Sequence, residues 1–286
     1  MSSPPCVTVV IPSYNHEAFV ADAINSVLQQ TYPSVELLVI DDGSADGSPA
    51  LLEKLAAEHG FRFIAQQNQG LTQTLNTALE LASGKYFCFL SSDDLMLPDR
   101  LQVQVDFMES RPDVALCGGA HQAIDNQGNR SGRSNLRPEA ELDFDAVFLH
   151  RIQPPSAATL LFRTDCLREI GGYDPKAPLE DFDMHLRLTA AGYKLVNLPQ
   201  ILALYRRHGS NTMRQHQRIL ESILYSLGKY ADHPRFEEAV NYERASFVLK
   251  AAKADKEYAR SLLQQIPLRY YSWRVIRGIF RLWFSR

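Results

Sequence analysis

The chain has 286 residues, of which 45% are hydrophobic and 22% charged, and its net charge is −3. This balance is typical of a globular protein and gives no reason to expect nucleic-acid binding. The four cysteines are scattered without metal-ligand spacing, which indicates a reducing, cytoplasmic setting. The N-terminus lacks the pattern of a signal peptide, and no apolar run reaches the roughly 18 residues of a membrane span. We therefore expect a cytoplasmic protein that does not cross a membrane.

Strand-like and helix-like segments alternate along most of the chain. Val7–Ile11 is a β-branched run that favours a strand, and residues 17–30 carry apolar side chains at helical spacing. The same patterns predict strands at 35–40, 61–65, 86–90, 114–119, 157–163 and 193–196, and helices at 48–59, 71–81, 98–110 and 179–191. Residues 126–141 are polar and predict a surface loop. The alternation predicts βαβ units and a doubly wound, mostly parallel sheet.

Strand signals cease at about residue 213. The rest of the chain has only helical patterns, over residues 213–230, 235–265 and 268–284. We therefore predict a first domain over residues 1–212 and a helical C-terminal region over 213–286.

Three predicted strands end in polar clusters, at residues 12–15, 41–44 and 91–94. The carboxyl ends of parallel strands share one edge of a sheet, where ligands bind, so these clusters are expected to converge. Asp93 and Asp94 are placed to bridge a divalent cation to a phosphate. Ser-Ser-Asp-Asp is also good turn chemistry. The glycine-rich phosphate cradles are absent, and the position of this acid pair as a third polar strand end favours the metal site.

A second acidic cluster begins the predicted helix at 179–191. Glu180 and Asp181 stand in its first turn, where acids are favoured by the helix dipole whatever their function. A catalytic base needs a carboxylate near a substrate hydroxyl. The residues alone leave capping and catalysis both open for Asp181.

In order and spacing, these elements resemble the family 2 glycosyltransferases, the inverting group with the GT-A fold, over about residues 6–210. The matching motifs are Val9-Val10-Ile11-Pro12-Ser13-Tyr14-Asn15, Asp41-Asp42-Gly43-Ser44-Ala45-Asp46, Asn68-Gln69-Gly70-Leu71, Asn76, Ser83-Gly84-Lys85-Tyr86, Ser92-Asp93-Asp94 with Pro98, Gly171-Gly172-Tyr173 and Glu180-Asp181-Phe182-Asp183. The resemblance implies a Rossmann-like, mostly parallel central sheet with flanking helices, followed here by the helical C-terminal region.

The resemblance also assigns roles to single residues. Pro12, Tyr14 and Asn68 belong to the nucleotide-sugar site, where Asp42 would accept a hydrogen bond from the base and Asp93 would lie near the ribose. Asp94 would bind Mg²⁺ or Mn²⁺, and His208 could be a second metal ligand or reach the diphosphate. A polar surface loop is the alternative for the segment that carries Arg206 and His208. Asp181 matches the catalytic base, with Glu180 in the acceptor site, and Arg206 could help to neutralise the diphosphate.

The implied reaction is inverting transfer of one sugar from a nucleotide-diphosphate sugar, typically UDP-linked, to a hydroxyl of a glycan or lipid-linked acceptor. Bacterial cell-surface polysaccharide synthesis is the expected setting. The alternatives are a catalytically silent GT-A-like module that binds nucleotide sugars or protein partners, and a nucleotidyltransferase. This chain lacks the N-terminal phosphate loop of a nucleotidyltransferase. A silent binding module would not require a base at Asp181.

Two positions depart from many relatives: Ser91 stands where an aspartate is common, and Leu75 where a basic residue is common. Both leave the donor sugar open. The QxxRW motif of processive members is absent, which favours addition of one sugar per encounter.

The segment 268–284 has no acidic residue and several arginines, three of which (Arg274, Arg277 and Arg281) fall on one helical face. Aromatic and aliphatic side chains occupy the rest of it. This pattern is typical of an interfacial helix on anionic lipid, and it predicts peripheral contact with the inner face of the membrane. A helix docked on the catalytic domain, or a dimer contact, remains the alternative.

Overall fold

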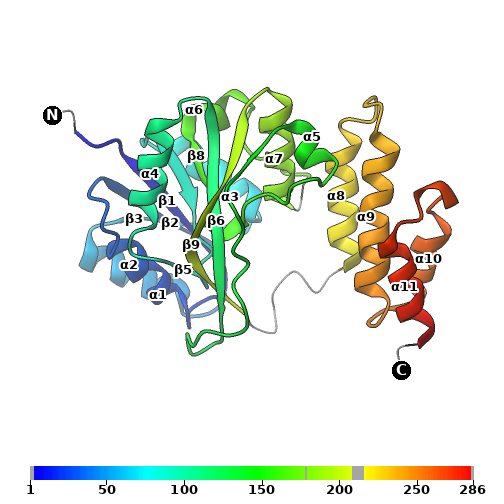
Figure 1. Cartoon of the computed structure of the whole chain (residues 1–286). Coiled ribbons are helices and arrows are strands. Elements are labelled where there is room, and N and C mark those ends of the chain that lie inside the picture. Colours follow the sequence, from blue (N-terminus) through cyan, green and yellow to red (C-terminus); the bar gives the residue numbers. More distant parts are fainter. Residues whose placement is uncertain (1–2, 178, 208–215, 285–286) are drawn as a thin grey trace. The chain divides into compact units, whose positions relative to one another are not determined.

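A computed structural model describes residues 3–177, 179–207 and 216–284 (Figure 1). The chain divides into two compact units. The first unit contains Met1–Asp143, Pro154–Pro175 and Arg187–Gly209, and the second contains Phe144–Gln153, Lys176–Leu186 and Ser210–Arg286. The predicted boundary at residue 212 therefore lies close to one of several places at which the chain passes from one unit to the other.

The first unit is built on one mixed sheet, which among the described residues has the strand order β3-β2-β1-β4-β8-β6-β9-β5. Its first four strands run parallel to one another. Their bounds are Val7–Ser13 for β1, Val35–Asp42 for β2, Arg62–Gln66 for β3 and Tyr86–Phe89 for β4. These strands were all predicted, because β-branched and aromatic residues concentrate in each of them.

The other strands mix parallel and antiparallel pairs. β6 and β9 pair in parallel, whereas β8 runs antiparallel to β4 and β6, and both β5 and β7 run antiparallel to β9. Their bounds are Leu95–Met96 for β5, Val114–Ile124 for β6, Ala140–Leu142 for β7, Leu161–Arg163 for β8 and Lys194–Arg206 for β9. The strand expected at 157–163 begins instead with a 3₁₀ turn, Ala157–Thr159.

Helices pack on both faces of this sheet. Val7, Val9 and Ile11 of β1 share one core with α1, α2 and α4, whereas Val10 points to the opposite face, where α3 contacts β1 and β2. The bounds are Val20–Leu28 for α1, Ser48–His59 for α2, Leu71–Leu81 for α3, Arg100–Ser110 for α4 and Thr164–Glu169 for α6. A sheet covered on both faces explains why its strands are continuous apolar runs.

The second unit is helical. Its elements are α5 (Phe144–Phe148), the start of α7 (Glu180–Ala190), α8 (His216–Gly228), α9 (Phe236–Ala251), α10 (Lys256–Gln264) and α11 (Trp273–Phe284). The single helix predicted over 235–265 is wrong. The chain breaks after α9, and the Asp255 side chain accepts a hydrogen bond from Tyr258 N to begin α10. None of the described helices has the length and apolar character needed to span a bilayer.

Candidate active site

The carboxyl ends of β1, β2 and β4 are joined by hydrogen bonds, as their polar residues predicted. Asn15 N donates to Ser44 Oγ at 2.8 Å, and Ala45 N donates to Asn15 Oδ1 at 2.8 Å. His16 Nδ1 lies 2.7 Å from Ser92 Oγ. Asn15 has a φ of +54°, a left-handed conformation that asparagine tolerates better than most residues. One edge of the first unit therefore holds all three polar clusters.

Asp42 is buried, and it holds the loop that precedes α3. Its Oδ1 accepts hydrogen bonds from Gln66 Nε2 and Gln69 N, and its Oδ2 accepts one from Gly70 N, each at 2.8 Å. This places the exposed Asn68 beside the turn after β2, where a Cβ on Gly43 would lie 2.8 Å from Asn68 N. The sequence did not predict this loop-holding role. It adds to the proposed role of Asp42 at the base, which stays a prediction.

Asp94 is the most buried carboxylate of the third cluster, with 1% of its surface exposed. Its Oδ1 accepts a hydrogen bond from Arg206 N at 2.9 Å. Burial and the adjacent charge of Asp93 raise the pKa of Asp94 well above its usual value. A cation bound there would offset both effects, because it stabilises the ionised form.

Arg206 is placed differently from the expectation that it helps to neutralise a diphosphate. Only 2% of its surface is exposed, and its guanidinium lies 4.8 Å from the ring centre of Phe19. The same group donates to the backbone oxygens of Asp93, Asp125 and Asn126 at 2.9, 3.2 and 2.9 Å. A buried guanidinium satisfied in this way ties β9 to the loop that carries the acid pair.

The other residues expected at the donor site differ in exposure. Tyr14 has 51% of its surface exposed, Pro12 is half-buried and Asp93 is buried. An exposed aromatic ring beside this polar edge can stack on a planar base. His208 lies outside the described residues.

Glu180 and Asp181 belong to the second unit, at the start of α7. Burial and the charge of Asp181 raise the pKa of Glu180, and burial raises the pKa of Asp181. Asp183 pairs instead with Lys229, which directly follows α8. Within the described residues, neither Glu180 nor Asp181 forms an ion pair.

The motif Gly171-Gly172-Tyr173 has a structural purpose that its sequence alone did not show. Asn76 Nδ2 donates to Tyr173 O at 2.8 Å, and Tyr173 N donates to Asn76 Oδ1 at 2.7 Å. Gly172 has a φ of +69°, and a Cβ there would lie 2.6 Å from Asn76 Oδ1. The signal in the sequence that could have indicated this contact is Asn76, because its side-chain amide in α3 can bond to both backbone groups of another residue.

No group of three or more His, Cys, Asp or Glu side chains suited to a metal occurs among the described residues. Mg²⁺ and Mn²⁺ sites of nucleotide enzymes commonly use one or two carboxylates together with substrate phosphates and water. The buried Asp94, with Asp93 beside it, fits that donor set.

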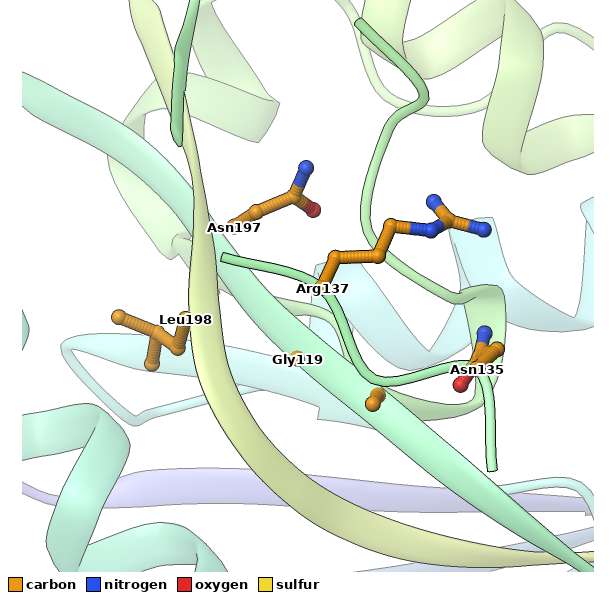
Figure 2. A pocket seen from close by; sticks show the side chains of 6 residues that line it. Gly119, Asn135, Arg137, Asn197 and Leu198 are labelled. Atoms are coloured by element: carbon orange, nitrogen blue, oxygen red, sulfur yellow. The ribbon is translucent and has the colours of Figure 1, made fainter. Parts of the chain in front are cut away.

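A small cavity lies elsewhere in the first unit, between β6, β9 and residues 135–137 (Figure 2). Its volume is about 10 Å³ and its lining includes Asn135, Arg137 and Asn197. Asn135 Oδ1 accepts a hydrogen bond from His121 N, and Arg137 Nη1 donates to Pro154 O. A space of this size holds about one water molecule, so it is not a substrate site.

Residues 8–170 match the family described as Glycosyl transferase family 2. EpsE of Bacillus subtilis, which is named as a glycosyltransferase, is 31% identical over 79% of this chain and 80% of its own length. The chondroitin synthase of Escherichia coli is 29% identical over 73% of this chain, which spans only 30% of that longer protein.

Two solved structures share the fold. Residues 1–349 of Staphylococcus aureus TarS, in complex with UDP-GlcNAc, superimpose with a TM-score of 0.67 at 17% identity, over 93% of this chain and 82% of that one. The mannosyltransferase PcManGT of Pyrobaculum calidifontis, in complex with GDP-Man and Mn²⁺, gives a TM-score of 0.63 at 18% identity, over 100% and 89%. These likenesses confirm the predicted GT-A fold. The family match over residues 8–170 and the likeness to EpsE establish that this chain belongs to the family 2 glycosyltransferases.

Proposed function

We propose that the chain transfers one sugar, with inversion, from a UDP-linked donor to a hydroxyl of a glycan or lipid-linked acceptor in bacterial cell-surface polysaccharide synthesis. The observation that carries the proposal is the joined edge of β1, β2 and β4, which holds the buried Asp94 among three polar strand ends. TuaG of Bacillus subtilis, which is named for teichuronic acid biosynthesis, is 38% identical over 37% of this chain and 43% of its own length. That name supports the polysaccharide setting.

The donor would bind along this edge. Tyr14 and Pro12 would flank the base and ribose, Asp42 would accept from the base, and Asn68 would contact the nucleotide from the loop that Asp42 holds. Asp93 would face the ribose. The complexes of TarS with UDP-GlcNAc and of PcManGT with GDP-Man support a nucleotide-sugar donor.

Asp94 would hold Mg²⁺ or Mn²⁺, with His208 as a second expected ligand. When bound, such an ion supplies positive charge that stabilises the departing diphosphate. Support comes from the burial of Asp94 and from the Mn²⁺ in the PcManGT complex.

Asp181 would act as the base, and Glu180 would position the acceptor. The proton of the acceptor hydroxyl passes to Asp181 as the acceptor oxygen bonds to the anomeric carbon, and the bond from that carbon to the diphosphate oxygen breaks. Displacement from the opposite side inverts the anomeric centre. A carboxylate whose pKa is raised by burial accepts a proton more readily near neutral pH, which supports this role.

We also propose that the protein works in the cytoplasm and meets its acceptor at the inner face of the membrane. A lipid-linked acceptor would be presented there.

UDP release from UDP-sugars, assayed with Mn²⁺ or Mg²⁺, tests the proposal. Asp94→Asn and Asp181→Asn should each lower the rate roughly 100-fold or more, and EDTA should abolish it until metal is restored. The exposed Asp106 and Asp232 provide matched controls, as Asp106→Asn in the first unit and Asp232→Asn in the second.

Unchanged release in both site variants would refute the assignment of these residues. A wild-type chain that binds UDP-sugars in a thermal-shift assay but releases no UDP with any acceptor would instead be a silent binding module.

A further inference from the structure

Helix α11 has one side buried in the second unit. Its buried residues are Val275, Gly278 and Leu282. α11 packs against α9 (Figure 1) so closely that a Cβ on Gly278 would lie 2.7 Å from Val248 Cγ1. This contact fixes the rotation of α11, and therefore which side chains point away from α9.

The side chains that point away are large and apolar. At about 100° per residue, they fall within one arc of roughly 100° around the helix. They are Trp273, Ile276, Phe280, Trp283 and Phe284, with exposed fractions between 41% and 78%. Exposed aromatic residues gathered on one face mark an interaction surface, whereas single ones do not.

Arginines occupy the arc between this apolar face and the buried stripe. Arg274 lies 4.2 Å from the ring centre of Tyr242, and Arg281 Nη1 donates to Leu249 O at 3.4 Å, so both lie along α9. Arg277 is exposed between them and the aromatic arc. The sequence contains no Asp or Glu after Glu257, so this end of the chain is uniformly basic.

We infer that the aromatic arc of α11 inserts into the headgroup region of an anionic lipid bilayer, with Arg277 and its neighbours on the lipid phosphates. Trp and Phe beside arginine suit the depth at which a bilayer changes from apolar to charged. A second copy of this chain is a poorer occupant, because its own α11 would bring arginines and no acid to meet these arginines. Anionic lipid supplies the missing countercharge.

The chain carries its own reporter for this inference. Its two tryptophans, Trp273 and Trp283, both lie on the exposed arc. With vesicles of phosphatidylglycerol and phosphatidylcholine in equal parts, the full chain should co-sediment and its tryptophan emission should shift to the blue. With phosphatidylcholine alone both changes should be much weaker, and added salt should reduce the difference between the two vesicle compositions.

Single substitutions separate the apolar and charged contributions. Arg277→Gln should lower the partition coefficient onto anionic vesicles roughly fivefold, the effect of one surface arginine. Trp283→Ser should lower binding to those vesicles at least as much, with Trp273 left as the reporter. Leu136→Ser and Arg133→Gln, at exposed positions of the first unit, are the matched controls and should bind as the wild type does.

Absence of vesicle binding, or equal binding to both vesicle compositions, would overturn the inference. So would a dimer in light scattering that Trp283→Ser converts to a monomer, because the arc would then face a second copy. The variants should release UDP as the wild type does, so this test succeeds or fails independently of the proposed catalytic residues.

Discussion

At the scale of single residues, Gly172 shows what a family motif does for the site. It combines a left-handed φ of +69° with a backbone that passes directly over the Asn76 amide. Asn76 in turn pairs with both backbone groups of Tyr173. These contacts tie the segment before α7 to α3, the helix whose first turn Asp42 positions.

Gly172→Ala should therefore destabilise the protein in two ways. The left-handed φ costs a residue with a Cβ about 1 kcal/mol. The added methyl must also displace the Asn76 amide, which should cost about 1–3 kcal/mol more through lost hydrogen bonds. Gly192→Ala is the matched control, because Gly192 has a φ of +91° but no atom within 4 Å of its Cβ position. Urea denaturation would measure both, and equal losses in the two variants would contradict the role given to Asn76.

At the scale of elements, periodicity predicted the strands that form the site edge, since each is a continuous buried run. It failed where a local interruption decided the outcome. β9 was expected over four residues but spans Lys194–Arg206, because a register shift opposite Gly118–Ala120 accommodates Pro199. Proline cannot donate to a ladder and is tolerated at such a bulge. This longer strand brings Arg206 to Asp94, a contact that no pattern in the sequence predicts.

The break between α9 and α10 depends on one capping side chain. Asp255 Oδ1 accepts a hydrogen bond from Tyr258 N at 2.9 Å. Asp255→Ala should lower the free energy of unfolding by about 1 kcal/mol, the usual loss on removal of an N-cap. Asp255→Asn keeps an acceptor and should lose much less. Thermal melts of both variants test this, and an Asn variant as unstable as the Ala variant would exclude the cap as the cause.

At the scale of the whole molecule, the two proposed reaction groups belong to different compact units, Asp94 to the first and Asp181 to the second. The sequence predicted the residue types and the convergence within the first unit. It could not predict how the chain divides, since α7 begins in one unit and ends in the other. Both groups share one physical signature, because burial raises the pKa of Asp94 and of Asp181. A carboxylate whose pKa is raised in this way lowers the free energy of unfolding once it is ionised, and such a cost is typical of functional sites.

This cost gives a dependence of stability on pH. The pKa values of Glu180 and Asp181 are raised in the folded chain, so folding favours their protonated forms. That contribution is complete below the ordinary carboxyl pKa of about 4 and is lost as pH rises through the raised values.

The double variant Glu180→Gln, Asp181→Asn remains neutral throughout. It should melt at a higher temperature than the wild type at about pH 8, with a smaller difference at about pH 5. Its UDP release should fall roughly 100-fold or more. Asp232→Asn, at an exposed position of the same unit, should change neither property. If the melting temperatures of the wild type and the double variant differ by the same amount across this pH range, these acids do not make stability depend on pH.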